Sequence, residues 1–302
     1  MIATPQGPST PLPVPPKEQG SSGGAFEEVC RTYETYLTKA TKARAELLRH
    51  YQPKALHAWR VNLRRITATL DRVAHALQGE EPLALFEQLR AFRNATGVAR
   101  DIDILLDETL PAFMAEDHQG AVFDPALLQA LEARRAQLHQ EAIDGLKKAR
   151  LTSSMHHFHA WSEAHLAVSD EQLRHVAAEL IESRFHQLHK RAVRMGDGRR
   201  HLHRLRTTTK KMRYIMELFQ PLFPRHAARH WLDQLADLQT HLGEAHDRIT
   251  ARVLCRELLP ESRKHAGIKA FRRWAKQTAA TSSTKAEASL EQLRQLGHYW
   301  RL

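Results

Sequence analysis

The feature that most constrains the fold of this chain is an internal repeat. When the 302-residue sequence is displaced by 146 positions, a pattern in its first half matches its second half. The pattern is HxxRxxx[RK][RK], then 31 residues, then GxxxD, and its six pairs are His57 with His203, Arg60 with Arg206, Arg64 with Lys210, Arg65 with Lys211, Gly97 with Gly243, and Asp101 with Asp247. A unit of this length exceeds a solenoid repeat, so the sequence predicts a duplicated subdomain.

The first copy of the pattern predicts a helix with two chemically distinct faces. At about 100° per residue, His57, Arg60 and Arg64 fall on one side with Arg65 at its edge, while the apolar residues of the range 59–77 fall on the other. The basic band holds no acidic residue. Like charges one turn apart cost a helix about 0.2–0.5 kcal/mol per pair, so the band indicates an anionic ligand. The second copy extends the same band with Arg213 and Tyr214.

Apolar periodicity predicts helices almost throughout, and no convincing strand pattern occurs. Expected helices cover about 26–50, 55–78, 82–97, 99–110, 125–150, 170–195, 201–220, 226–242, 245–259, 261–277 and 285–296, with a partly helical stretch at 152–168. The segment TAATSST, residues 278–284, is expected to separate the last two.

The expected fold is therefore all-α, with two four-helix bundles related by internal pseudo-two-fold symmetry. Residues 25–168 form the first half and 169–302 the second, with long antiparallel helices around a basic central groove or pore. Residues 1–24 are rich in Pro, Gly and Ser, which predicts a disordered arm.

Composition adds a preference for anionic partners. Lys and Arg total 45 against 34 Asp and Glu, a formal net charge of +11, which favours nucleic acid, an anionic surface or a free polyanion. The two cysteines, Cys30 and Cys255, lie far apart, so we expect small buried thiols rather than a disulfide framework. Neither a signal peptide nor a membrane-spanning run is evident, which favours a cytoplasmic protein.

The paired motifs HAWRVNLRR…TGVARDID and HLHRLRTTTKKMRYIMEL…LQTHLGEAHD resemble the CHAD domain, the conserved histidine α-helical domain, over about residues 26–296. The resemblance implies a basic central pore that binds inorganic polyphosphate, and association with polyphosphate granules. The second copy departs from the first in having His246 before Asp247, where the first has Arg100 before Asp101. No triphosphate-tunnel domain of the CYTH type is evident, so a stand-alone, non-catalytic domain is expected.

Carried over by position, the resemblance assigns polyphosphate binding to His57, Arg60, Arg64, Arg65, His203, Arg206, Lys210, Lys211 and Arg213. Basic residues on neighbouring helices are expected to widen the groove, chief among them Lys42, Arg135 and Arg191. Asp101 and Asp247 are expected to pair with an arginine or cap a helix. Whether His57 and His203 contact the ligand or are structural stays open.

No metal or other cofactor is expected. Neighbouring arginines would repel a cation at His57 and His203, and the histidines of MHHFH (residues 155–159) and at 226 and 230 lack accompanying Cys or acids. The sequence does not predict an oligomeric state.

Polyphosphate suits the two bands because a flexible anionic chain without bases needs a row of cations and guanidinium forks. A phosphoanhydride hydrolase, either a polyphosphatase or a triphosphatase, is a second possibility, but each half offers too few acids to argue for a magnesium cluster. A nucleic-acid-binding protein is a third. Tyr214 is the single aromatic residue of the bands, whereas single-strand binders stack bases on several.

Overall fold

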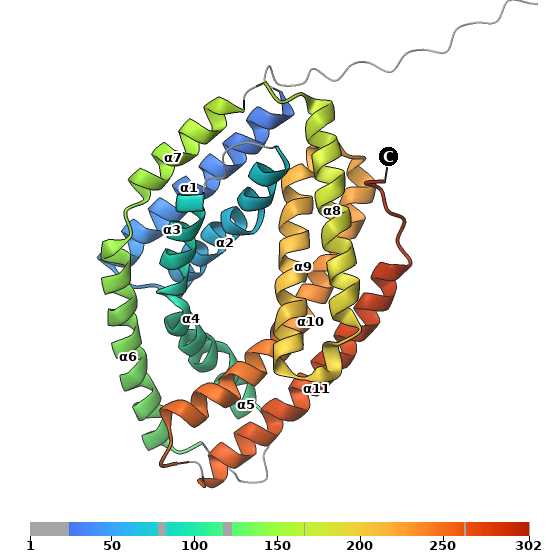
Figure 1. Ribbon diagram of the computed structural model, residues 1–302. Coiled ribbons are helices and arrows are strands. Elements are labelled where there is room, and N and C mark those ends of the chain that lie inside the picture. The colour runs from blue at the N-terminus through green and yellow to red at the C-terminus, as the bar shows by residue number, and fades with distance from the viewer. Residues whose placement is uncertain (1–23, 78–82, 117–122, 166, 263, 302) are drawn as a thin grey trace, which may run out of the picture.

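The computed structural model describes residues 24–77, 83–116, 123–165, 167–262 and 264–301, and within these ranges every regular element is a helix (Figure 1). The all-α prediction is therefore confirmed. The predicted arm, residues 1–24, lies outside the described residues except for Gly24, which precedes the first helix. None of the helices in the described ranges combines the length and apolarity needed to cross a bilayer.

The first half contains eight described helical elements. They are α1 (Ala25–Arg49), α2 (Pro53–Ala76), α3 (Leu83–Asn94), α4 (Gly97–Ile104), the π-helical turn η1 (Leu105–Thr109), α5 (Leu110–Met114), α6 (Pro125–Lys148) and α7 (Leu151–Ala164). The second half contains α8 (Asp170–Ala192), the 3₁₀ turn η2 (Met195–Asp197), α9 (Arg199–Phe219), the 3₁₀ turn η3 (Gln220–Leu222), α10 (Arg225–Leu258) and α11 (Ala266–Arg294).

The helix bounds follow the 146-residue offset of the sequence repeat. Pro53 begins α2 and Arg199 begins α9, while Lys148 ends α6 and Arg294 ends α11. Helix α8 begins within one residue of the position that the offset assigns to the start of α1. The two-fold axis and the closing of each half into a four-helix bundle stay predictions.

Two predicted breaks between helices of the second half are wrong. Helix α10 runs unbroken through Gly243, and α11 runs unbroken through TAATSST. A glycine inside a helix costs only about 1 kcal/mol, and packing of α10 along α11 outweighs it. In α11, Thr278, Thr281 and Ser283 donate their hydroxyls to carbonyls one turn earlier, so these side chains are satisfied within the helix.

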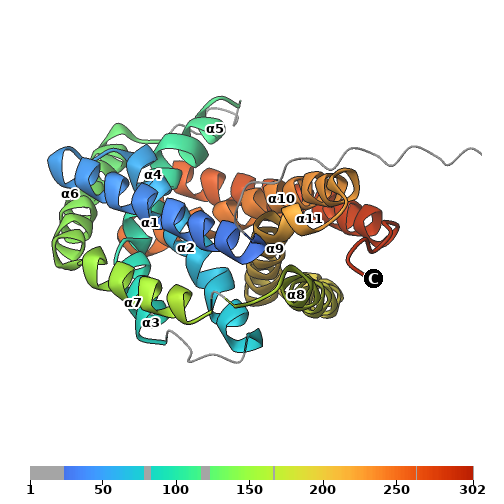
Figure 2. The same ribbon diagram turned by 90° about the horizontal axis from the view of Figure 1, so that it is seen from above.

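Helices α2 and α9 lie at the centre of the molecule and pack against each other. Figure 2 shows α8 on one side of this pair and α6 and α7 on the other. The apolar stripe of α2, including Trp59 and Leu63, is fully buried, and α2 packs along α1 and α3. The basic band on the opposite side of α2 is therefore directed away from this core. Helix α10 forms a second contact between the halves, against α4 and η1.

The two cysteines are free and buried. Burial raises the pKa of each thiol to about 12, so both are protonated and unreactive at neutral pH. This confirms the expectation of small buried thiols.

Candidate functional site

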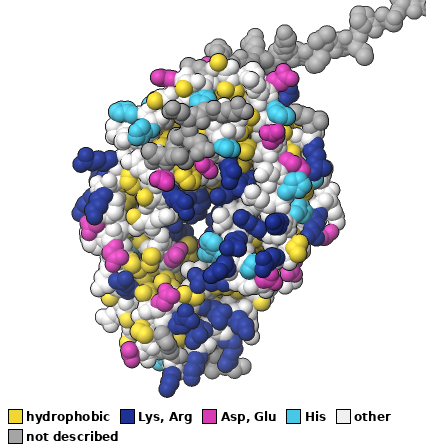
Figure 3. Space-filling view, viewed as in Figure 1, with side chains coloured by type: hydrophobic (Ala, Val, Ile, Leu, Met, Phe, Trp, Pro, Cys, Tyr) yellow, Lys and Arg dark blue, Asp and Glu magenta, His cyan; other side chains and the backbone are white. Residues whose placement is uncertain are grey.

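A cavity of about 850 Å³, called here the central cavity, lies between the two halves and is lined by α2, α4, α9 and α10. Figure 3 shows Lys and Arg side chains gathered around a hollow in the middle of this face. Its charged and histidine lining comprises His57, Arg60, Arg64, Arg100, Asp101 and Glu108 from the first half, and Arg199, Arg200, His203, Arg206, Lys210, His246 and Asp247 from the second. Both basic bands of the sequence repeat thus line one space.

A second cavity of about 460 Å³ adjoins the first. The two share Arg60, Arg64, His203, Arg206 and Lys210, so these side chains form a layer between them, in which four of the five are Arg or Lys. The second cavity adds further basic and aromatic residues, including Arg90, Arg93, Lys211, Phe86 and Tyr214.

Arg60 and Arg206 occupy equivalent positions of the repeat, but different contacts hold them in place. Arg60 donates through Nη1 to the carbonyl oxygen of Arg93 at 2.6 Å and to the hydroxyl of Thr96 at 3.1 Å, so it spans the break between α3 and α4. Arg206 instead lies 3.7 Å from a carboxylate oxygen of Asp247 on the unbroken α10. Burial, together with nearby Arg64, lowers the pKa of Arg60 to about 10, so it stays charged at neutral pH.

Arg64 and Lys210 are basic residues of this layer that lack a carboxylate partner in the described part of the chain. Among the described residues, neither makes an ion pair with a carboxylate. Burial lowers the pKa of Lys210 well below its ordinary value, and nearby Arg206 and Arg64 lower it further. Holding such charges in a half-buried space costs free energy unless an anion enters. The cavity is therefore suited to an anionic ligand.

The second half carries a hydrogen-bonded chain of titratable groups. The Nδ1 atom of His203 lies 3.0 Å from Nε2 of His246, and Nδ1 of His246 lies 3.2 Å from Oδ1 of Asp247. Because Asp247 is an acceptor, this geometry assigns the protons to Nδ1 of both rings and leaves Nε2 of His203 without one.

Both repeat histidines are neutral in the free cavity at neutral pH. Burial, with neighbouring His246 and Arg206, lowers the pKa of His203 to about 4. Burial also lowers the pKa of His57, helped by Arg100 and Lys210.

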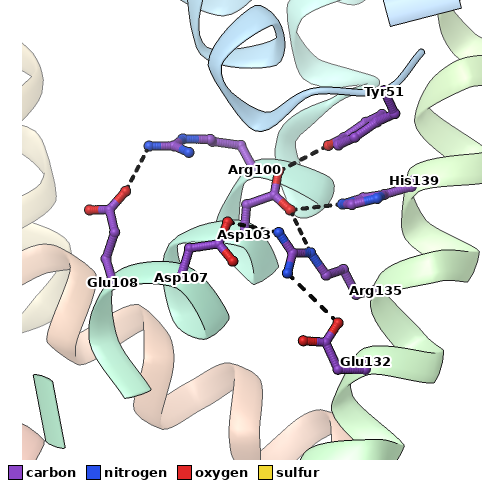
Figure 4. Close-up of polar contacts among 8 residues, drawn as sticks. All are labelled: Tyr51, Arg100, Asp103, Asp107, Glu108, Glu132, Arg135 and His139. Atoms are coloured by element: carbon purple, nitrogen blue, oxygen red, sulfur yellow. Dashed lines mark hydrogen bonds and ion pairs between the residues drawn. The ribbon is translucent and has the colours of Figure 1, made fainter. Parts of the chain in front are cut away.

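Two of the three acidic residues of the cavity pair with an arginine. Burial by itself would raise the pKa of Asp247, but the hydrogen bond from His246 and the charge of Arg206 hold it below its usual value. Asp101 lines the cavity near Arg60, and its pKa is raised by burial. Among the described residues it makes no ion pair and caps no helix, unlike its expected role. Glu108 pairs with Arg100 at 3.1 Å, as Figure 4 shows.

Two residues of the predicted bands lie outside both cavities. Arg65 and Arg213 converge on Glu217, at 3.3 and 2.8 Å. The guanidinium of Arg65 also lies over the rings of Tyr36 and Tyr214. Each band covers a wider arc than the cavity, and the two residues at its edge share the one carboxylate of Glu217. The structure therefore does not bring them to the cavities, and their ligand contacts stay predictions.

The three auxiliary residues predicted on neighbouring helices also lie elsewhere. Arg135 binds Asp103 at 3.0 Å and Asp107 at 2.7 Å, within a network that includes Tyr51 and His139 (Figure 4). It joins α6 to α4 and η1 and is a structural residue. Lys42 is exposed on α1, and Arg191 donates to the Arg204 carbonyl and the Thr208 hydroxyl.

Sequence reasoning missed several residues that line the central cavity, chiefly Arg100, Arg199, Arg200 and His246. Two local signals could have found some of them. Arg199 precedes His203 by one helical turn, and Arg100 and His246 stand immediately before the two repeat aspartates. In the described ranges, no group of three or more His, Cys, Asp or Glu side chains is arranged to hold a metal ion.

The helices and the cavity together define an all-α protein whose two repeated halves enclose a basic space. Residues 32–256 match the sequence model of the CHAD domain family, and the chain belongs to that family. It is similar in fold to the crystal structure of the CHAD domain from the plant Ricinus communis, with a TM-score of 0.75 at 24% identity over 91% of this chain and 93% of the other. No curated protein matches it.

Proposed function

We propose that this chain binds inorganic polyphosphate in the central cavity and thereby associates with polyphosphate granules in the cytoplasm. The observation that carries the proposal is the convergence of both basic bands on one space, with Arg64 and Lys210 lacking any ion pair among the described residues. Membership of the CHAD family supports the same ligand, because the family is reported to bind polyphosphate.

The chemistry of the lining favours a polyanion without bases. Seven Lys or Arg residues and three His face three carboxylates, so the wall carries a clear positive excess. Guanidinium forks match phosphate oxygens in pairs. No aromatic residue lines the central cavity in the described ranges, so it offers no platform for base stacking. Polyphosphate therefore suits it better than nucleic acid.

The role proposed is binding rather than catalysis. Asp247 and Glu108 are engaged by Arg206 and Arg100, and Asp101 lies near Arg60. Asp247 and Glu108 thus help to hold a cation in place, whereas Asp101 makes no ion pair among the described residues. One observation favours a second candidate, a phosphoanhydride hydrolase: the chain from His203 through His246 to Asp247 could hold and move a proton inside the cavity.

A competition experiment tests the proposed function. Purified protein is titrated with labelled long-chain polyphosphate across a salt series, with DNA, RNA and ATP as competitors at equal charge. We expect unlabelled polyphosphate to compete best, and affinity to fall steeply with salt because bound cations are released from the polyanion. Competition by DNA as strong as that by polyphosphate would overturn the proposal. Phosphate release measured with and without Mg²⁺ tests the hydrolase, and sustained turnover would favour it.

A further inference from the structure

A separate basic pocket lies next to the central cavity and belongs to neither copy of the repeat pattern. It has a volume of about 230 Å³ and lies between the start of α9, the C-terminal part of α10 and α11. Its lining residues, which define the arginine pocket, are Arg199, Arg252, Arg256 and Arg272 with Ile249 and Val253. Figure 3 shows Lys and Arg side chains gathered at the lower end of the face, over α10 and α11.

The arginine pocket carries positive charge without compensation. No acidic residue lines it, and in the described ranges none of its four arginines makes an ion pair or a side-chain hydrogen bond. The Nε atoms of Arg252 and Arg272 are buried without a hydrogen-bond partner. Burial and the charge of Arg272 lower the pKa of Arg252. Buried guanidinium donors without partners are costly, and an anion would satisfy them.

Comparison of the two repeated halves shows that Arg252 and Arg256 have no basic counterpart in the first half. The 146-residue offset places Leu106 and Leu110 at the positions equivalent to Arg252 and Arg256. Both leucines are buried in the core of the first half. The segment that follows the repeat aspartate therefore has buried leucines at two positions of the first half where α10 has arginines.

Arg199 links the arginine pocket to the central cavity, because its side chain lines both. An extended anion that leaves the central cavity past Arg199 would meet Arg252, Arg256 and Arg272 next. The remaining walls, Ile249 and Val253, are aliphatic and offer no surface for base stacking. The pocket therefore suits phosphate oxygens rather than a nucleotide.

We propose that the arginine pocket is a second subsite, which holds a further segment of the polyphosphate chain whose first segment occupies the central cavity. This inference rests on the proposed function and adds a chain-length preference to it. Short chains fill the central cavity alone, whereas long chains reach both subsites and bind more tightly. Each added contact is a charge-assisted hydrogen bond between a guanidinium and a phosphate oxygen.

The test compares a long and a short ligand on matched variants. Long-chain polyphosphate and tripolyphosphate are each titrated by calorimetry into the native protein, the double variant Arg252→Ala with Arg256→Ala, and a control, Arg229→Ala with Arg273→Ala. The control removes two exposed arginines from the same helices, outside the pocket. We expect the pocket variant to bind long chains about tenfold more weakly and tripolyphosphate as the native protein does. The control should bind both ligands like the native protein.

The possible outcomes separate this inference from the proposed function. If the native protein binds neither ligand, both proposals fail. If it binds both and the pocket variant matches the control, the second subsite alone is wrong. An equal loss for both ligands would also overturn it, because the pocket would then belong to the first binding site. Saturable binding of orthophosphate that requires Arg252 and Arg256, without a chain-length effect, would assign the pocket to free phosphate instead.

A second variant keeps the test decisive if the double variant unfolds. Arg256 is exposed on α10, so Arg256→Ala removes no core packing. Thermal denaturation reports the fold of each variant. We expect the single variant to show a smaller loss of long-chain affinity with unchanged tripolyphosphate binding, and native affinity for long chains would count against the subsite.

Discussion

The two copies of the repeat line the same cavity but hold their cations differently. In the first half, Arg60 is fixed on backbone and hydroxyl oxygens at the break between α3 and α4, and Arg100 is paired with Glu108. In the second half, α10 is unbroken, and Arg206 lies beside Asp247 within the chain of His203 and His246. The side of the cavity formed by the first half, the first wall, therefore contains one histidine, His57, while the second wall contains the linked pair His203 and His246.

This difference shows that a duplicated motif can keep its charge pattern while its supporting contacts diverge. His246 stands where the first copy has Arg100, so one permanent cation is replaced by a titratable ring. The substitution removes one guanidinium from this position of the second wall, next to His203, whose pKa is lowered to about 4 in the free cavity. Binding to this wall should therefore be coupled to proton uptake.

The largest expected effect comes from reversing one central charge in each half. The double variant Arg64→Glu with Lys210→Glu should abolish polyphosphate binding, with an affinity loss of about a hundredfold or more. The reason is that both residues lie in the layer shared by the two cavities and lack other counter-ions among the described residues. Binding is measured by calorimetry, and circular dichroism checks the helical signal.

The matched control reverses two exposed lysines of α1, Lys39→Glu with Lys42→Glu. Because these residues lie outside both cavities, it should bind with close to native affinity at moderate salt. Survival of binding in the Arg64 and Lys210 variant would place the binding site elsewhere.

A smaller effect on affinity is expected when His246 is replaced by arginine, the residue found at the equivalent position of the first half. In the native protein, affinity should rise as the pH falls from about 8 to about 5.5, because a bound polyanion raises the low pKa of His203 and a proton enters with the ligand. The variant His246→Arg should bind about fivefold more tightly near pH 8 and depend less on pH. Calorimetry in two buffers of different ionisation enthalpy measures the proton uptake.

The reciprocal variant, Arg100→His, serves as the comparison. It replaces a permanent cation of the first wall, so it should weaken binding near neutral pH and increase the pH dependence. Equal native affinity at both ends of the pH range would show that the two walls do not differ in proton coupling.

The smallest expected effect is on stability, when the repeat glycines Gly97 and Gly243 are replaced by alanine. A Cβ atom at Gly243 would meet nothing within 4 Å, and one at Gly97 would lie 3.8 Å from Nη1 of Arg60. Gly243 lies inside α10, so Gly243→Ala should stabilise the free protein by about 0.5–1 kcal/mol. Gly97 is the first residue of α4, so Gly97→Ala should gain less. Urea denaturation measures both free energies of unfolding, and a destabilised Gly243→Ala variant would contradict this account.

Much of the fold followed from local pattern. The helical spacing around His57 and the apolar stripe containing Trp59 and Leu63 predicted a two-faced helix at about 55–78, close to the observed Pro53–Ala76. The errors arose at Gly243 and at TAATSST, where weak helix formers suggested breaks. Long-range packing of α10 along α11 overrode these local preferences.

Residue type and spacing were sufficient to predict the helical class, the duplication and the positive charge of two helix faces, because these properties are set within single helices. Which cations line a cavity depends on the packing between helices. This packing gave Arg65 and Arg213 to Glu217 and Arg135 to Asp103, and it brought Arg100, Arg199 and His246 beside the repeat residues. The physical reason is that the neighbours of a side chain across helices depend on how those helices pack, and a motif within one helix carries no record of that packing.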